Sequence, residues 1–281
     1  MALQTKPEPD QFEAKAAVVT GAGSGIGRSC AILLGKLGAR VYAADLNGAA
    51  AIAVAGEIND AGGEATGHTV DVTDAEQVQA FADTVFAEAG RVDILHNNAG
   101  IGHAGPLEDT PLEDWRKVID VNVMGVVNGL NAFVPRMIEL GGDAHIVNTA
   151  SMAGLQASAG MAPYVTSKFG VVGMSLALDA ELKDHNIRVT ALCPGVINTA
   201  IVKDSTMRGA IEKKHDALTG FYKKRGVSPD VVARDMVNAI LRKQVIKPSP
   251  WWQVSPGWWL MRVSPRAYTG LARKTYKKII G

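Results

Sequence analysis

Short apolar runs alternate along the chain with longer stretches in which apolar and polar residues recur at helical spacing. The runs predict β-strands at 16–20, 40–44, 64–70, 92–96, 145–149 and 187–192. The stretches between them predict helices at 26–37, 49–61, 75–89, 112–140 and 161–183. Regular alternation of this kind indicates right-handed βαβ units. We therefore expect an α/β fold: a single Rossmann-type, doubly wound parallel sheet of about seven strands with helices on both faces.

A glycine-rich segment joins the first predicted strand to the first predicted helix. Glycines allow a sharp turn and a close backbone approach to a pyrophosphate, which can rest on the N–H groups at the helix start. The strand–loop–helix context favours a dinucleotide site over a merely flexible turn. The residues expected around the phosphates are Gly21, Ser24, Gly25, Ile26 and Gly27.

The second predicted strand ends at an acidic residue, Asp45, which is followed by Leu46. In dinucleotide folds a carboxylate at this place accepts hydrogen bonds from the adenosine ribose and repels a 2′-phosphate. No Arg or Lys follows closely, and Ser24 in the glycine loop is neutral. The sequence therefore predicts NAD rather than NADP as the cofactor, the alternative being an ordinary turn acid.

Three residues suited to proton transfer follow the fifth predicted strand: Ser151, Tyr164 and Lys168. Tyr164 and Lys168 are four residues apart on a predicted helix and so share one face. An isolated phenol titrates at about pH 10, and a neighbouring ammonium is expected to lower its pKa. Tyr164 then suits a general base for alcohol oxidation and a general acid for carbonyl reduction. Ser151 can hydrogen-bond the substrate oxygen as charge develops on it.

Taken together and in this order, the motifs strongly resemble those of the short-chain dehydrogenase/reductase family. The matching positions, within about 14–235, are Thr20, Gly21, Gly25 and Gly27 (TGxxxGxG), Asp71 and Val72, Asn97 to Gly100 (NNAG), Asn122, Ser151, Tyr164 and Lys168 (YxxxK), and Pro194, Gly195 and Thr199. The resemblance implies a homodimer or homotetramer built on the helices around 114–140 and 161–183.

The resemblance also implies roles for individual residues. Asn122 would support a water that links Lys168 to solvent, and Lys168 would hold the ribose of the nicotinamide half as well as acting beside Tyr164. Asp71 and Val72 would contact the adenine. The remaining cofactor positions that it implies are Asn98, Ala99, Gly100, Pro194, Gly195, Val196 and Thr199.

Substrates of open α/β sheets bind beyond the carboxyl ends of the strands. Three segments are expected there, at 101–107, 152–163 and 198–226, and the last of these is interpreted as a mobile lid or, alternatively, a plain helical connection. The second is rich in Met, Leu and Ala, which predicts a medium-sized hydrophobic alcohol or ketone. The expected pocket residues are His103, Met152, Gln156 and Met161.

Composition places the chain among globular proteins, with 47% hydrophobic and 20% charged residues. Two cysteines in 281 residues make no disulfide framework, which favours a reducing compartment. No Cys/His cluster has metal-ligand spacing, so no metal is predicted. The first residues lack the apolar stretch of a signal peptide, and we expect a cytoplasmic protein.

The C-terminal part of the chain differs from the rest. Residues 236–281 carry nine Lys/Arg and no acid, whereas 1–235 carry 20 basic and 28 acidic residues. We predict an oxidoreductase domain at 1–245 and a Trp-rich basic extension at 246–281. Trp beside Lys and Arg is typical of peripheral membrane contact; a subunit interface and packing over the protein's own pocket are the alternatives. No nucleic-acid-binding module is recognised, and no nucleic-acid partner is expected.

The sequence thus predicts hydride transfer between NAD and a secondary alcohol or ketone. One alternative is a nucleotide-binding sensor or scaffold on the same fold, because a fold alone does not determine function. Another is an NAD-dependent dehydratase or epimerase, although the additional acid or base that such chemistry requires cannot be identified.

Overall fold

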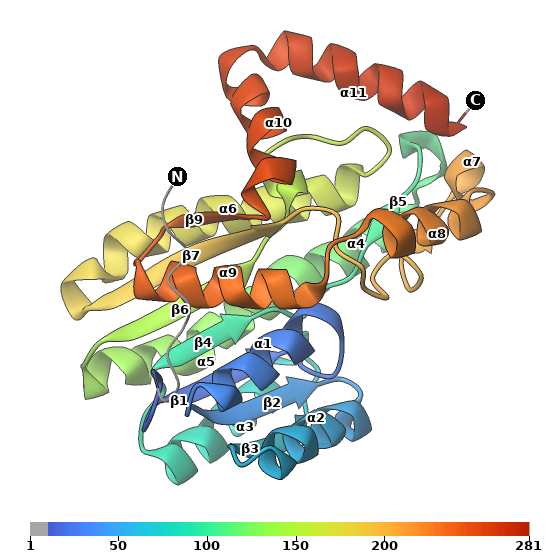
Figure 1. Ribbon diagram of the computed structural model, residues 1–281. Helices are drawn as coiled ribbons and strands as arrows, with labels where there is room; N and C mark the ends of the chain where they lie inside the picture. The colour runs from blue at the N-terminus through green and yellow to red at the C-terminus, as the bar shows by residue number, and fades with distance from the viewer. Residues whose placement is uncertain (1–10, 281) are drawn as a thin grey trace.

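Figure 1 shows the computed structural model of the chain, which describes residues 11–280. Seven parallel strands form one sheet in the order β3-β2-β1-β4-β6-β7-β9. The strands are β1 Ala16–Thr20, β2 Arg40–Asp45, β3 Glu64–Thr69, β4 Ile94–Asn97, β6 Ala144–Thr149, β7 Ile187–Pro194 and β9 Ile246–Ser249. A separate two-stranded sheet pairs β5 His103–Ala104 with β8 Thr206–Met207.

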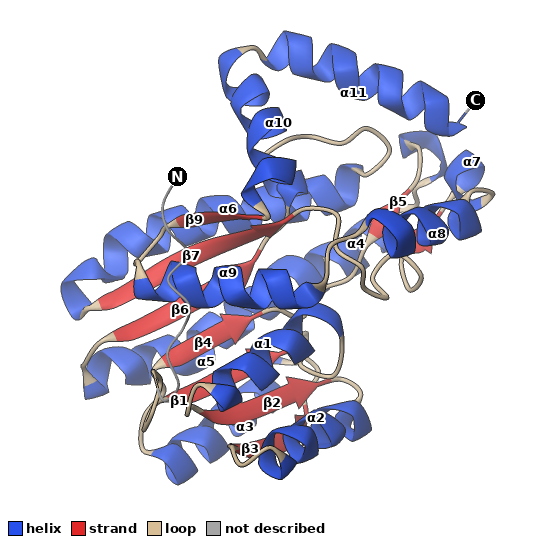
Figure 2. Ribbon diagram, viewed as in Figure 1, coloured by secondary structure: helices blue, strands red, loops and turns tan. Residues whose placement is uncertain are grey.

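Helices cover both faces of the large sheet (Figure 2), which confirms the predicted doubly wound fold. Those of the sheet layers are α1 Gly25–Lys36, α2 Gly48–Asp60, α3 Ala75–Ala89, α5 Gly125–Leu140, α6 Ala162–Leu182 and α9 Pro229–Leu241. The others are α4 Leu112–Ile119, α7 Gly209–Glu212, α8 His215–Arg225, α10 Trp251–Val263 and α11 Pro265–Ile280.

Side chains of alternate strand residues point to opposite faces of the sheet and build two cores. Val18 and Ile146 belong to the core shared with helices α3, α5 and α6. Their neighbours Val19 and Val147 belong to the core shared with α1, α2 and α9. The central strands are apolar without interruption because both of their faces are buried.

Two elements differ from the sequence prediction. The predicted helix 112–140 is divided into α4 and α5 by a π-helical turn at Asp120–Met124. Strand β9 lies within the segment that was predicted as the extension, so the boundary at 245/246 is four residues too early. Its sequence, Ile-Lys-Pro-Ser, has no apolar run because β9 is an edge strand, and edge strands commonly carry Lys and Pro.

The stretch Leu112–Leu140 also has the length and hydropathy of a membrane span, but 44% of its most apolar window is buried within the fold. It packs against α3 and α6, as a core helix of a globular domain does.

A topological switch positions the functional site. From β1 the chain proceeds to β2 and β3 on one side and then crosses back to β4 on the other. The connections that follow β1 and β4 therefore diverge and leave a crevice at the carboxyl ends of these strands, where ligands of such folds bind.

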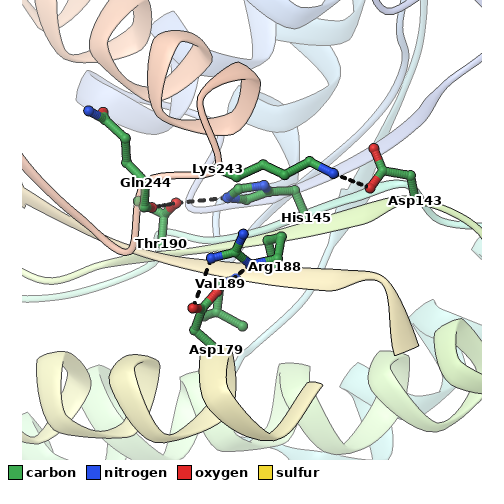
Figure 3. Close-up of polar contacts among 8 residues, drawn as sticks. All are labelled: Asp143, His145, Asp179, Arg188, Val189, Thr190, Lys243 and Gln244. Carbon is green, nitrogen blue, oxygen red and sulfur yellow. Dashed lines mark hydrogen bonds and ion pairs between the residues drawn. The ribbon is translucent and has the colours of Figure 1, made fainter. Parts of the chain in front are cut away.

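The opposite, amino-terminal end of the sheet is closed by polar contacts (Figure 3). His145 Nε2 lies 2.7 Å from Thr190 Oγ1, which donates to the carbonyl oxygen of Gln244. Asp179 pairs with Arg188 through two hydrogen bonds of 2.8 and 3.0 Å. These contacts join β6, α6 and β7 to the turn that precedes β9. Burial lowers the pKa of His145 from 6.5 to about 4.

This depressed pKa predicts a loss of stability in mild acid. Below pH 6.5 the unfolded chain binds a proton at His145 that the folded chain does not, so stability falls until the folded pKa near 4 is reached. At pH 5 the contribution is about 2 kcal/mol. In urea titrations at pH 7 and pH 5, we expect His145→Gln to lose less stability than the wild type, by about that amount.

The exposed His185 provides the control, because His185→Gln should behave like the wild type. The same drop in stability in wild type and His145→Gln would contradict the assignment. Buried His96 shifts the wild-type curve in the same direction, since burial lowers its pKa to about 3.

Candidate active site

The glycine loop lies at the carboxyl end of β1 and leads into α1 (Figure 1). Gly25 has φ +53°, a conformation that L side chains rarely adopt. A Cβ on Gly27 would lie 2.1 Å from the carbonyl oxygen of Gly21, so only glycine allows the turn to close. The first N–H groups of α1 lack partners within the helix and, with the helix dipole, attract phosphate. This loop therefore fits a dinucleotide pyrophosphate.

Side-chain hydrogen bonds hold this loop to the end of β4. Thr20 Oγ1 accepts from the backbone N–H groups of Asn98, at 2.9 Å, and Ala99, at 3.1 Å. The Asn98 side-chain amide donates to the carbonyl oxygen of Thr20 at 3.0 Å. Thr149, at the end of β6, donates its hydroxyl to Asn98 Oδ1 at 3.2 Å. Three neighbouring strand ends are thereby fixed relative to one another.

Asp45 ends β2 with its carboxylate beside the glycine loop. It accepts hydrogen bonds from the backbone N–H groups of Gly23, at 2.8 Å, and Asn47, at 2.9 Å. Among the described residues, no Lys, Arg or His forms an ion pair with it. The adjacent Leu46 is 70% exposed, an apolar surface next to the acid. A negative charge without a cation at this place disfavours a second phosphate.

Ser151, Tyr164 and Lys168 come together at the carboxyl end of β6. The side chains of Ser151 and Tyr164 are hydrogen-bonded to each other. Lys168 Nζ lies 5.8 Å from the centroid of the Tyr164 ring and donates to the carbonyl oxygen of Thr149 at 2.9 Å. Ser151 precedes a 3₁₀ turn, Met152–Gly154, and its hydroxyl accepts from the Ala153 N–H at 3.1 Å. The geometry can hydrogen-bond one substrate oxygen from two hydroxyls.

Asn122 stands behind this group on the π-helical turn between α4 and α5, and is fully buried. Its amide accepts from the Ile101 N–H at 2.8 Å and donates to the Ile101 carbonyl oxygen at 2.9 Å. A Cβ on Gly100 would lie 3.1 Å from Asn122 Oδ1 and 3.3 Å from Lys168 Nζ, so Gly100 lies beside both polar groups and a larger residue would crowd them. Such π-turns recur at functional sites because they redirect one side chain.

The expected direction of the Tyr164 pKa is not found in this structure. Burial raises the pKa of Tyr164 to about 12, although the hydrogen bond from Ser151 acts in the opposite direction. Burial also lowers the pKa of Lys168 from 10.5 to about 8. The sequence predicted a phenol stabilised as phenolate by the lysine, but desolvation outweighs that attraction here. At neutral pH Tyr164 therefore holds its proton.

The remaining predicted cofactor positions lie at or shortly after the carboxyl ends of β3, β4 and β7. Asp71 and Val72 follow β3; Asp71 accepts from the Thr73 N–H at 2.9 Å, and the Val72 carbonyl oxygen accepts from Asn128 at 2.8 Å. Pro194 ends β7. A Cβ on Gly25 would lie 3.1 Å from Thr199 Cγ2, so the segment after β7 reaches over the start of α1.

The three segments predicted around the substrate are in mutual contact. The Gly105 N–H donates to the Gly160 carbonyl oxygen at 2.8 Å, and the Arg208 N–H donates to the Ala104 carbonyl oxygen at 2.9 Å. The segment 198–226 contains β8, α7 and α8 rather than only loop. Met152, Gln156 and Met161 lie where the segments converge: Gln156 is buried and the two methionines partly so.

His103, predicted as a substrate contact, has a different place. Its side chain is fully buried, and Nε2 lies 3.1 Å from Asp114 Oδ2. Asp114 also accepts two hydrogen bonds from Arg208, at 2.8 and 3.1 Å. The guanidinium of Arg208 holds the pKa of Asp114 below its usual range. His103 thus belongs to a polar anchor that attaches the segment 198–226 to α4.

The C-terminal extension packs over the same region. The Val196 N–H donates to Gln253 Oε1 at 2.9 Å, so α10 touches the segment predicted to flank the nicotinamide. A Cβ on Gly257 would overlap the amide of Gln156, and a Cβ on Gly160 would meet the ring of Tyr276. One face of the extension therefore packs against segments that were predicted to line the substrate pocket and to flank the nicotinamide.

Sequence reasoning missed Asp114, Arg208 and Gln253. An acid and an arginine far apart in the chain carry no local signal of their pairing. Gln253 lies in a tryptophan-rich segment, and nothing in the local pattern marks it as a contact of Val196. Among the described residues, no group of three or more His, Cys, Asp or Glu side chains could hold a metal ion.

A family model described as short chain dehydrogenase matches residues 15–208. The chain belongs to this family. The sheet order and helical layers described above agree with this assignment.

Proteins similar to this chain are named as oxidoreductases or dehydrogenases. Probable oxidoreductase EphD of Mycobacterium tuberculosis is 42% identical over 265 residues, which cover 91% of this chain and 44% of EphD. The chain thus spans less than half the length of that relative. 1-Deoxy-11-beta-hydroxypentalenate dehydrogenase of Streptomyces exfoliatus is 42% identical over 202 residues, with 71% and 74% covered. A crystal structure of a short chain dehydrogenase/reductase from Burkholderia phymatum in complex with NAD matches with a TM-score of 0.77 and 33% identity, covering 84% of this chain and 89% of that one.

The anchor of Asp114 and Arg208 predicts how the segment 198–226 opens. Arg208→Met removes two hydrogen bonds to a largely buried acid and leaves the Asp114 carboxylate without those donors. Hydrogen–deuterium exchange of amides in 198–226 should therefore become about tenfold faster, while exchange in the sheet is unchanged. Lys213→Met, at an exposed position of the same segment, is the control. Unchanged exchange in Arg208→Met would show that the segment is held by other contacts.

Proposed function

We propose that this short chain dehydrogenase transfers a hydride between NAD(H) and a medium-sized hydrophobic secondary alcohol or ketone, with Tyr164 as general acid/base. The observation that carries the proposal is the hydrogen-bonded pair of Ser151 and Tyr164 with Lys168 beneath it. This group lies at the same end of the sheet as the glycine loop. A cofactor seated on that loop and a substrate oxygen held by the two hydroxyls would therefore meet.

In ketone reduction, each residue of the proposed site has a separate role. Ser151 and Tyr164 hold the carbonyl oxygen, and Tyr164, which keeps its proton at neutral pH, donates it as negative charge develops. Bound NADH supplies the hydride. Lys168, with a pKa near 8, is poised to exchange a proton at neutral pH and to return one to Tyr164. Asn122 holds the backbone beside Lys168 in place.

Two features support NAD as the cofactor. The Asp45 carboxylate at the end of β2 is placed to accept the ribose hydroxyls and to repel a 2′-phosphate. The Burkholderia phymatum relative is a complex with NAD. Gly21, Ser24, Ile26, Asn98, Gly195 and Val196 complete the proposed cofactor contacts.

The surroundings of the pair favour an apolar substrate. Met152 packs beside the core together with Trp258 of α10, and Ile211 of α7 is buried close to Gly160. Gln156 Oε1 is buried with no hydrogen-bond partner among the described residues, and so suits a polar group of the substrate. A similar relative is named for the oxidation of a hydroxylated pentalenate, in keeping with a bulky hydrophobic alcohol.

The assembly is proposed to be a homodimer or homotetramer through the helices at 114–140 and 161–183. Large apolar side chains are exposed on them at Met124, Leu140, Phe169 and Leu176. Burying such side chains against a second copy would stabilise the pair.

Tyr164→Phe tests the reaction class, because it removes one hydroxyl and leaves the ring. We expect NADH formation from a panel of hydrophobic secondary alcohols to fall by about 10²–10⁴-fold, the range for loss of a general acid/base. Binding of NADH, followed by its own fluorescence, should be retained. Full activity in Tyr164→Phe would exclude the proposed acid/base. NADH binding without turnover of any alcohol or ketone by the wild type would favour the sensor or the dehydratase and epimerase alternatives.

Asp45→Asn tests the choice of cofactor, since it removes the charge and keeps an oxygen that accepts from Gly23. The ratio of kcat/KM for NADP to that for NAD should rise by about tenfold or more, because repulsion of the 2′-phosphate is lost. Steady-state rates with both cofactors measure the ratio. Ser24→Ala, a neutral change in the same loop, should leave it unaltered. A wild-type preference for NADP would refute the role of Asp45.

A further inference from the structure

The outer surface of the extension carries a row of exposed tryptophans. Trp251, Trp252 and Trp259 are 67%, 57% and 61% exposed, and Val263 is 80% exposed. Trp252, Trp259 and Val263 recur at i, i+7 and i+11 and so lie on one face of α10. Burial of large apolar side chains lowers the free energy. Because these indoles are mostly exposed, the isolated chain lacks much of that stabilisation. We name the surface formed by these four residues the tryptophan face.

The tryptophan face does not result from a loosely attached helix. On the other side of α10, Val254 is completely buried in the core and Gln253 hydrogen-bonds the backbone of Val196. Trp258 packs against the core cluster, and Arg262 lies over its ring. The helix is thus apolar on both sides. Only the inner side is covered by other parts of the protein.

The two helices of the extension carry only cationic charged side chains. Helices α10 and α11 together carry six Lys or Arg and no Asp or Glu: Arg262, Arg266, Arg273, Lys274, Lys277 and Lys278. All six are exposed. Within the described residues none of them forms an ion pair, whereas Lys243 and Lys247 nearby in the chain do. Close to α11 lie the acids Glu108 and Asp109: burial raises the pKa of the Tyr276 phenol, and these two carboxylates raise it further.

The position of these helices leaves the surface accessible. Figure 1 shows α10 leaving the sheet next to β9 and α11 running back across the top of the molecule toward α7. In α11, Tyr268, Ala272 and Tyr276 recur every four residues and are the least exposed, so this side faces the body. Arg273, Lys274 and Lys277 lie on the remaining surface of the helix and are exposed.

We infer that the tryptophan face and the exposed cations of α10 and α11 are a docking surface for an anionic lipid bilayer. Indoles are stable at the level of the headgroups, and cations beside them meet the phosphates of anionic lipid. A symmetric contact between two copies of this face would instead bring two sets of unpaired cations together, which is unfavourable. Neither helix here needs to span the bilayer; both would lie in its interface.

The extension would then have two surfaces with different functions. Its inner side covers the pocket through Gln253, Gly257 and Tyr276, and its outer side would face the lipid. A hydrophobic substrate dissolved in that bilayer would then be close to the pocket. The docking itself is independent of the proposed function and is measured without cofactor or substrate.

The direct test is co-sedimentation of the full chain with vesicles of phosphatidylcholine, alone or containing phosphatidylglycerol. We expect binding to the anionic vesicles that weakens as salt is added, and little binding to the neutral ones. With brominated lipids, the tryptophan fluorescence of bound protein should be quenched, because exposed indoles enter the headgroup region. Absence of binding to anionic vesicles, or binding without quenching, would overturn the inference.

Two variants separate charge from insertion. Each cation near an anionic surface contributes about a fivefold gain in binding, so Arg273→Gln with Lys277→Gln should weaken partitioning about thirtyfold. Trp252→Ser with Trp259→Ser should strongly reduce the quenching, and adding Trp251→Ser should abolish it. The matched controls are Lys36→Gln with Lys183→Gln, and Ile52→Ser, all at exposed positions of the body. Circular dichroism verifies that each variant is folded.

The variants also distinguish other partners. An oligomer without lipid that dissociates in Trp252→Ser with Trp259→Ser would assign the face to a second copy and overturn the inference. Equal weakening by the control charges would show general electrostatic adsorption and would overturn it as well. Binding of an anionic polymer such as RNA with no binding to anionic vesicles would have the same consequence.

Discussion

The alignment of three strand ends is the constraint on which the site depends. Thr20 and Thr149 end β1 and β6, Asn98 directly follows β4, and hydrogen bonds link Thr20 to Asn98 and Asn98 to Thr149. Lys168 donates to the carbonyl oxygen of Thr149 and so joins the same network. A change of one residue in the register of any strand would turn these polar side chains toward a core. The glycine loop and the proton-transfer group would then no longer face one crevice.

The same burial that fixes the site determines its protonation. Lys168 is almost fully buried without a carboxylate, which disfavours its charge and lowers its pKa to about 8. The phenol of Tyr164 is affected in the opposite direction and holds its proton. A site that desolvates both groups thus drives their pKa values apart, from 10.0 and 10.5 in water to about 12 for Tyr164 and about 8 for Lys168. The lysine becomes able to exchange protons near pH 8 while the tyrosine remains the donor.

The sequence predicted the sheet and the residues that local patterns mark. The strand and helix periods placed most elements within a few residues, since the central strands are buried on both faces and therefore apolar throughout. The π-turn at Asn122 was not predictable, because it depends on how α4 and α6 pack around that side chain. The pairing of His103, Asp114 and Arg208 was missed for a similar reason. Burial, which sets the pKa of Tyr164, is likewise a property of the folded surroundings.

The extension shows why composition alone could not choose among its interpretations. Trp and Arg next to each other are compatible with a membrane, a subunit or the protein's own pocket, and in α10 neighbouring residues have different tasks. Gln253 and Val254 face inward, whereas Trp252 faces out, one residue apart in the chain. Successive helical residues are 100° apart, so a short tryptophan-rich segment can serve two surfaces at once. The pocket interpretation accounts for the inner side only, and the unpaired charge beside the outer indoles is what favours lipid there.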